Sequence, residues 1–484
     1  MLRLSDSNRA WWVLIGSCLG LFILMLDSTI VSLALSDIRR ELEMSSASLQ
    51  WVMNGYLLTI AVLVVTAGRL GDMFGRKRVF VIGMAIFAVG SIVSATAESA
   101  GAIIAGRVVQ GVGGAALISL SLAITCDAFP GERQAQAIGI WTAVSSIALA
   151  IGPAVGGLLV EADWRLIFWI NLPIAVAGVA VTTVAARESR DPAAGTRLDV
   201  PGLLTLSAGM TAIVLALIEG RDWGWTSPET LGLAAAGVLL IAAFWFIEHH
   251  VSNPIVEFEL FRNGPYFGAT AAAFTLVGAF WSLMFFEPQY LQDVLGYGPV
   301  EAGLLILPIT VPMIAISPFA GPLIARFGPR LLMTAGLACA AVGIGLLSRI
   351  DSGSGYADLL PGFTLFGIAL GLVYAPMSSA AMAAMPRTKA GIAAGVLAMN
   401  RVLAGAVALA ATGAVFGSLE SDGETFTYSL AHALWILVGL TVVGTVLTWA
   451  FVRAPKKKGP DPAIAGDPPP AELRHHAQHR RFHL

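Results

Sequence analysis

Long apolar runs constrain the fold of this chain more than any other feature. Fourteen stretches approach or exceed the roughly 20 residues that a helix needs to cross the hydrocarbon core of a bilayer. Only 12% of the residues are charged, against about 25% in soluble domains. The runs therefore predict an all-α polytopic membrane protein with fourteen transmembrane helices. Their limits are 11–35, 49–67, 79–97, 101–125, 138–160, 166–186, 200–218, 231–247, 267–290, 301–325, 331–349, 357–385, 391–417 and 430–452.

Basic residues predict how the chain is oriented. An even number of crossings places both termini on one side, and loops rich in Lys and Arg face the cytoplasm. With a cytoplasmic N-terminus, 22 of the 29 Lys and Arg residues fall inside and five outside, while Arg107 and Arg401 lie within runs. The first run is too long for a signal peptide. We expect a multi-pass protein of the cell (plasma or inner) membrane with both termini cytoplasmic.

An internal repeat predicts the domain organisation. Residues 68–78 follow the second run and residues 321–330 follow the tenth, and Gly, Leu, Phe and Gly coincide at an offset of 253 residues. The offset spans eight runs rather than six, so two helices are inserted between two six-helix bundles. The expected parts are a cytoplasmic N-terminus (1–10), an N-terminal bundle (11–186), a linker with the two inserted helices (187–266), a C-terminal bundle (267–452) and a basic, His-rich cytoplasmic tail that we expect to be disordered (453–484).

One acid interrupts the first apolar run. An acid at the centre of a membrane-spanning helix costs about 2.5–3.5 kcal/mol, so Asp27 is unlike its neighbours in the run. Asp27, Arg107 and Pro153 lie eight, six and seven residues from the outer ends of their runs, which places them in one layer. We hypothesise that Asp27 takes up a proton outside and releases it inside, with Arg107 tuning its proton affinity. The alternatives are an Asp27 that only holds packing together and an Arg107 that clamps helix-end carbonyls.

Five sequence motifs stand in order along the first half of the chain. They are residues 26–31 in the first run, 68–78 after the second, 107–115 in the fourth, 148–157 in the fifth and 164–173 at the start of the sixth. These motifs resemble those of the major facilitator superfamily and, within it, the fourteen-helix drug/proton antiporters, a group of multidrug exporters. The resemblance covers all fourteen runs and leaves out the tail. There are departures: Ala148 replaces a glycine, and Ser32 and Ser36 replace an asparagine and a proline.

The resemblance implies roles for residues in these motifs. In the loop after the second run, bounded by Gly68 and Gly75, Asp72 and Arg76 form a cytoplasmic latch that stabilises the outward-open state. The helix-five motif bends its helix and seals a leak path; proline removes a backbone donor and glycines permit close packing. Its residues are Gly152, Pro153, Gly156 and Gly157. The helix-four motif contributes Gln110, Gly111 and Gly114.

Several further residues are candidate substrate contacts. Aromatic side chains could line a cavity or form belts at the membrane interface. Glu287 could bind a cationic substrate or be a wetted acid at the membrane boundary, and Arg401 could contact an anionic group or a neighbouring helix. The aromatic candidates are Trp51, Tyr56, Trp141, Trp281 and Tyr374.

These observations favour a proton-coupled antiporter that exports amphiphilic small molecules (drugs, antibiotics or related metabolites) by alternating access. We expect it to use the proton gradient, to need no cofactor or metal, and to act as a monomer without nucleic-acid partners. ATP is not expected, since no Gly-x-x-x-x-Gly-Lys-Ser/Thr loop is present. The alternative is a dedicated exporter or importer of one metabolite, lipid or peptide. A membrane enzyme is disfavoured because no nucleophile–base or metal cluster emerges.

Overall fold

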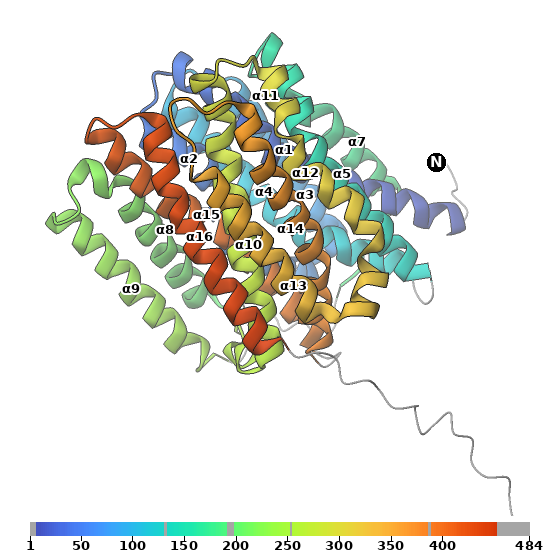
Figure 1. The fold of residues 1–484 in the computed structure, drawn as a ribbon. Helices are drawn as coiled ribbons and strands as arrows, with labels where there is room; N and C mark the ends of the chain where they lie inside the picture. The colour runs from blue at the N-terminus through green and yellow to red at the C-terminus, as the bar shows by residue number, and fades with distance from the viewer. Residues whose placement is uncertain (1–5, 130–132, 191–197, 252–253, 386–388, 453–484) are drawn as a thin grey trace, which may run out of the picture.

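The computed structural model describes residues 6–129, 133–190, 198–251, 254–385 and 389–452, and over these ranges every regular element is helical (Figure 1). The predicted His-rich tail lies outside them. The first half contains α1 (Asp6–Glu41), α2 (Ser46–Phe74), α3 (Arg76–Ala95), α4 (Ala100–Ala128), α5 (Arg133–Ala162), α6 (Leu166–Trp169) and α7 (Asn171–Ala185). The inserted pair is α8 (Val200–Trp223) and α9 (Pro228–Glu248). The second half contains η1 (Phe258–Arg262), α10 (Gly264–Gln289), η2 (Tyr290–Val294), α11 (Pro299–Leu305), α12 (Leu307–Ile316), η3 (Ser317–Phe319), α13 (Ala320–Leu347), α14 (Tyr356–Ala383), α15 (Ala390–Ser421) and α16 (Phe426–Phe451).

The helices account for fourteen membrane crossings. Thirteen described segments are long and apolar enough to cross a membrane, and one of them, Pro299–Leu347, has 49 residues. At 1.5 Å per residue that segment would span about 74 Å, more than twice a hydrocarbon core of about 30 Å. It is broken at Gly328, whose φ of 75° and ψ of 158° are not helical. The segment therefore makes two crossings, and the predicted fourteen-helix fold is confirmed.

The two halves repeat the same packing. Helices α1, α2, α3 and α4 correspond to α10, α12, α13 and α14, and each half packs its second and third helices against its fourth. The glycine at the matching loop position has a positive φ in both halves, 116° at Gly75 and 75° at Gly328. A residue with a Cβ rarely adopts that backbone conformation. The conserved spacing of these glycines in the sequence thus reflects the same sharp turn between consecutive helices.

The inserted helices lie at the side of the molecule rather than within either half. Helix α8 packs against α2 of the first half and α15 of the second, and α9 packs on α8 (Figure 1). Trp51 Nε1 on α2 donates to Glu219 on α8 at 3.3 Å, and Trp225 after α8 donates to Ser418 on α15 at 3.0 Å. The pair therefore bridges the two halves at one edge.

Contacts between the halves gather on one side of the membrane. We call the side on which α1 begins and α16 ends the terminal side, and the other the far side. At the far side Ser36 donates to Asp293 at 3.1 Å, and Ser46 donates to Glu420 at 3.0 Å. Further in, Thr310 donates to the carbonyl of Ala150 at 3.2 Å. Between the described residues, no hydrogen bond or ion pair joins the two halves closer to the terminal side.

The terminal-side part of α5 lacks such neighbours. A Cβ added at Gly139 would meet no atom within 4 Å, whereas one at Gly157, near the far side, would strike the backbone of Pro299. Gly321, which begins the matching loop of the second half, is equally open. The contact between α5 and the second half is therefore tight at Gly157, near the far side, and absent at Gly139.

Candidate functional site

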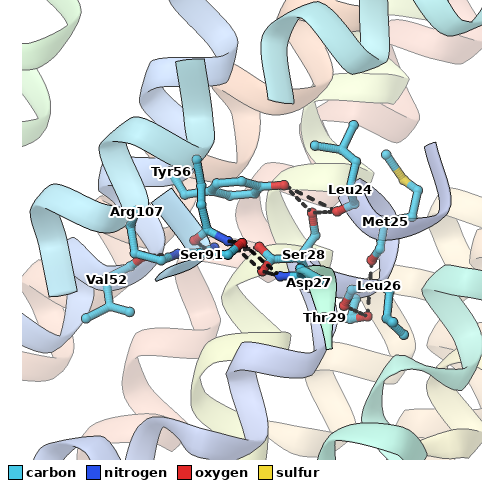
Figure 2. A network of polar contacts seen from close by, with 12 residues as sticks. Leu24, Met25, Leu26, Asp27, Ser28, Thr29, Val52, Tyr56, Ser91 and Arg107 are labelled. Atoms are coloured by element: carbon cyan, nitrogen blue, oxygen red, sulfur yellow. Dashed lines mark hydrogen bonds and ion pairs between the residues drawn. The ribbon is translucent and has the colours of Figure 1, made fainter. Parts of the chain in front are cut away.

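A buried ion pair joins the first and fourth helices of the first half. Arg107 Nη1 on α4 lies 2.5 Å from Asp27 Oδ2 on α1, and neither side chain is exposed (Figure 2). Arg107 Nε also donates to the carbonyl of Val52 at 3.1 Å, and the guanidinium carbon lies 4.1 Å from the centre of the Tyr56 ring. The structure thus brings together the two residues that the sequence assigned to proton coupling, while that role stays a prediction.

Neutral side chains surround this ion pair. Gln110 accepts from Arg107 Nη1 at 2.8 Å and donates to Asp27 Oδ1 at 3.0 Å. Asn171, the first residue of α7, donates to the same Oδ1 at 2.8 Å. Ser91 on α3 accepts from both amides, at 2.8 Å from Gln110 and 3.3 Å from Asn171. The carboxylate of Asp27 thus accepts hydrogen bonds from one charged and two neutral side chains.

Sequence reasoning named Gln110 but missed Asn171 and Ser91. Asn171 stands inside the helix-six motif on which the family resemblance rests, and its amide in an apolar run was the signal that could have found it. Ser91 offered no signal, because a serine in a helix can bond its own backbone and needs no partner elsewhere.

Glycines of the helix-four motif allow the acid and the base to meet. A Cβ at Gly111 would come within 2.9 Å of the Tyr56 carbonyl oxygen on α2. A Cβ at Gly114 would come within 2.8 Å of the Leu24 side chain on α1. At Gly111 the atom met belongs to the backbone, so α4 can approach α2 this closely only with glycine there. At Gly114 a Cβ would require the Leu24 side chain to shift.

The helix-five motif packs against both halves. Gly152 faces the Thr29 side chain and Gly156 faces Ile30, one turn beyond Asp27 on α1. On the other side Gly157 faces the carbonyl of Pro299. The carbonyl of Pro153 is likewise met by Gly303 of α11. The motif therefore lies in the layer predicted from the sequence and forms part of the far-side contact between the halves.

The predicted latch is an ion-pair cluster at the terminal side. Arg76 Nε lies 2.8 Å from Asp72 Oδ1, and its Nη1 donates to both oxygens of Asp127 at 2.8 and 2.9 Å. Asp127, at the end of α4, was not anticipated. It also accepts from Ser189 at 2.6 Å. The cluster joins α2, α3 and α4 to the segment after α7, so in this conformation these contacts stay within the first half and that segment.

Gly75 and Gly68 have different surroundings. Gly75 has a φ of 116°, and a Cβ there would strike the carboxylate of Glu188. That carboxylate accepts from the backbone N–H of Lys77 at 3.1 Å. Gly68 faces the Ser119 side chain on α4 at an ordinary contact distance, 3.6 Å for a Cβ. Only Gly75 therefore has a strict conformational reason to be glycine.

The aromatic candidates are placed in packed layers. Tyr56 is fully buried, and its hydroxyl lies 3.0 Å from Ser28 Oγ and 3.2 Å from the Leu24 carbonyl. Trp141 Nε1 donates to Ser121 Oγ on α4 at 3.2 Å. Trp281 is 8% exposed and lies against Gly405 of α15. Tyr56 and Trp281 thus pack between helices, whereas the half-buried Trp141 and Trp51 donate hydrogen bonds from their indole N–H groups to neighbouring helices.

The two charged candidates in the second half differ from each other. Arg401 Nη2 donates to Ser378 Oγ at 2.5 Å and its guanidinium lies 4.9 Å from the centre of the Tyr374 ring, so it contacts neighbouring helix α14. Glu287 is fully buried, which contradicts the reading of a wetted boundary acid. That reading relied on its position near the end of an apolar run, but α10 runs to Gln289 and η2 follows directly, so Glu287 lies inside a continuous helical segment.

No metal centre is found in the part of the chain that the structure describes: no three His, Cys, Asp or Glu side chains there could hold an ion.

Comparisons with known proteins agree with this geometry. The family model described as Major Facilitator Superfamily matches residues 17–409. The "Multidrug resistance protein Stp" of Mycobacterium tuberculosis is 37% identical over 407 residues, which are 84% of this chain and 75% of that protein. The "Tetracenomycin C resistance and export protein" of Streptomyces glaucescens is 35% identical over 416 residues, 86% of this chain and 77% of that protein. A solved D-xylose–proton symporter, 14% identical, superposes with a TM-score of 0.68 over 93% of this chain and 99% of that chain.

Proposed function

Because the chain belongs to the major facilitator superfamily, we propose that it exports amphiphilic small molecules from the cell in exchange for protons. Family membership makes it a membrane-embedded secondary transporter of small molecules, not an enzyme, and the superfamily works without a cofactor. The substrate class is carried over from relatives named for multidrug resistance and tetracenomycin C export. The energy source is the proton gradient.

The observation that carries proton coupling is the buried pair of Asp27 and Arg107. A proton that adds to Asp27 Oδ2 removes the negative charge 2.5 Å from Arg107 Nη1, and with it the main attraction that holds the two side chains together. Arg107 Nη2 has no partner among the described residues. Protonation therefore frees a guanidinium that can turn towards a substrate or water, so uptake and release of the proton change how α1 and α4 pack.

The substrate crosses the membrane by alternating access, in which the two halves move relative to each other. The moving bodies are residues 11–186 and 267–452, and residues 187–266 bridge them at one edge. The terminal side is the cytoplasm, as the basic loops favour, and this structure is the inward-open state. To open outward, the far-side contacts at Gly157 and Glu420 separate, and the loop with Asp72 and Arg76 meets the second half. One chain contains the whole path and acts as a monomer in the cell membrane.

Transport by reconstituted protein tests this function. Full-length protein in proteoliposomes is given an imposed pH gradient and a panel of compounds that includes ethidium, chloramphenicol and puromycin. Wild-type protein should accumulate at least one compound against its gradient, and Asp27→Asn should abolish that accumulation while exchange of the compound without a pH gradient persists. The matched control is Asp422→Asn, which changes an exposed acid in the loop after α15.

Two results would contradict the proposal. Gradient-driven accumulation by Asp27→Asn equal to that of wild type would remove proton coupling from this residue. Accumulation of one compound alone from a chemically broad panel would favour a dedicated exporter.

A further inference from the structure

The first helix of the second half contains a buried acid that proton coupling at Asp27 does not use. Glu287 on α10 has no exposed surface, and neither of its carboxyl oxygens has a hydrogen-bond partner among the described residues. Leu283 and Leu291, one turn away on either side of the same helix face, are also fully buried. The carboxyl group of Glu287 therefore lies in an apolar layer.

The internal repeat allows the position of Glu287 to be compared with that of Asp27. Phe280 occupies the position that corresponds to Asp27, and Glu287 lies two turns further along the corresponding helix. The position that corresponds to Arg107 is Leu360, which is 40% exposed and cannot act as a base. Each half thus places one acid inside its first helix, but only the first half supplies a base and amide donors for it.

Charged side chains on the helices that pack against α10 are engaged elsewhere. Helices α1, α13, α14, α15 and α16 pack there, and η2 continues it. Their pairings are Asp27 with Arg107, Asp37 with Arg40, Glu41 with Arg165, Arg39 with Glu420, Asp293 with Ser36, Arg326 over the ring of Phe327, Arg330 over that of Trp449, Asp358 with the backbone of Gly355, Arg401 with Ser378, and His432 with the carbonyl of Tyr428. The short helix η1 also packs on α10, but its Glu259 and Arg262 lie beside the first residues of α10, 25 or more positions before Glu287. The nearest titratable residue along the chain is Tyr290, the first residue of η2, and a tyrosine hydroxyl is neutral at physiological pH.

An acid in this position is neutral. A buried carboxylate without a donor or a cation is far costlier than the protonated acid, so the group takes up a proton instead. The helix is also irregular here: Pro288 lacks the N–H that would bond the Met284 carbonyl, and the π-helical turn η2 begins at Tyr290. The α-helical hydrogen-bond pattern is therefore interrupted beside the acid, where the helix can deform when the packing loosens.

We propose that Glu287 holds a second exchangeable proton, and that a cationic substrate displaces it. The proton leaves a carboxyl oxygen for water on the terminal side as the positive charge of the substrate arrives, so the buried layer stays neutral throughout. This inference rests on the proposed function. Asp27, paired with Arg107, exchanges its proton whatever the charge of the substrate, whereas Glu287 exchanges its proton only against a cation.

The first test asks whether Glu287 is protonated and needs no substrate. Infrared spectra of purified full-length protein at pH 7.5 should show the carbonyl band of a protonated carboxyl group, and Glu287→Gln should lack it. Glu287→Asp should keep a band at a shifted frequency, which guards against a variant that fails to fold. Glu301→Gln, a change of an exposed acid at the start of α11, is the matched control. Identical spectra for wild type and Glu287→Gln would overturn the proposal.

The second test counts protons. Proteoliposomes with the membrane voltage held at zero receive a gradient of one pH unit, and the steady-state accumulation of ethidium and of neutral chloramphenicol is measured. One proton fewer per cation lowers the limiting accumulation ratio tenfold at this gradient, since each proton contributes a factor of ten per pH unit. Glu287→Gln should therefore lose tenfold for ethidium and nothing for chloramphenicol, and Glu287→Asp should recover most of the loss.

The outcomes separate this inference from the proposed function. An unchanged ethidium ratio in Glu287→Gln, with Asp27→Asn still inactive, would refute the second proton and leave proton-coupled export intact. An equal loss for both compounds would make Glu287 a structural group or a general coupling site, which also overturns the proposal. If wild type accumulates neither compound nor any other on the panel, the proposed function itself fails.

Discussion

Replacing Arg107 by methionine tests the energetics of the buried ion pair. Methionine fills much of the volume of the arginine stem but removes the charge that lies 2.5 Å from Asp27. Removing one partner of a buried pair costs about 3–5 kcal/mol. The stranded carboxylate keeps its hydrogen bonds from Gln110 and Asn171, at 3.0 and 2.8 Å, but has no countercharge.

Protonation of the carboxyl limits that cost and makes it depend on pH. Protonating an ordinary aspartate costs about 4 kcal/mol at pH 7 and about 1.5 kcal/mol at pH 5. The free energy of unfolding of Arg107→Met should therefore fall by about 3–4 kcal/mol at pH 7 and by only about 1–2 kcal/mol at pH 5. The destabilisation is present at high pH and disappears as pH falls, since the neutral acid needs no partner charge.

The measurement is reversible unfolding in mixed detergent micelles, followed by tryptophan fluorescence at both pH values. Asp27→Asn strands a guanidinium that does not titrate in this range, so its loss should be the same at pH 7 and pH 5. The double variant Asp27→Asn with Arg107→Met buries no charge and should lie within about 1–2 kcal/mol of wild type. The reasoning is refuted if Arg107→Met loses equally at both pH values, or if the double variant is as unstable as either single one.

Two further changes test the far-side closure. Glu420→Gln, near the end of α15, weakens contacts at 3.8 Å to Arg39 and 3.5 Å to Arg221, which are partly exposed and worth about 1 kcal/mol or less together. Spin-label distances across the far side should then report an up to fivefold larger open population. Glu424→Gln, in the loop after α15, is the control, and unchanged distances in Glu420→Gln would contradict this prediction. Gly157→Val puts a side chain against the carbonyl of Pro299, so far-side closure and transport in proteoliposomes should slow at least tenfold. The control Gly139→Val meets open space and should transport at the wild-type rate. Wild-type rates for both variants would show that the α5–α11 contact does not limit the transport cycle.

The membrane architecture follows from the length of the apolar runs. Backbone polar groups in lipid must bond within their own helix, so apolar runs of sufficient length become crossings, including the two that Gly328 separates. Depth within the membrane can also be counted along a helix, because each residue advances 1.5 Å. That count placed Asp27, Arg107 and Pro153 in one layer, and the structure brings Asp27 and Arg107 into contact.

The direction in which each side chain faces depends on tertiary packing. The rotation of a helix about its axis is set by its neighbours, and an apolar run that is hydrophobic on all sides has no amphipathic pattern from which to read it. Tyr56 therefore packs under Arg107 instead of on a cavity surface. Asn171 on α7 donates to Asp27, and Ser91 on α3 accepts from Asn171. The sequence does not show that these two side chains face α1. Glu287 looked like a boundary acid because distance from the end of a run does not show what covers a residue, and the packing of α10 buries it without a partner.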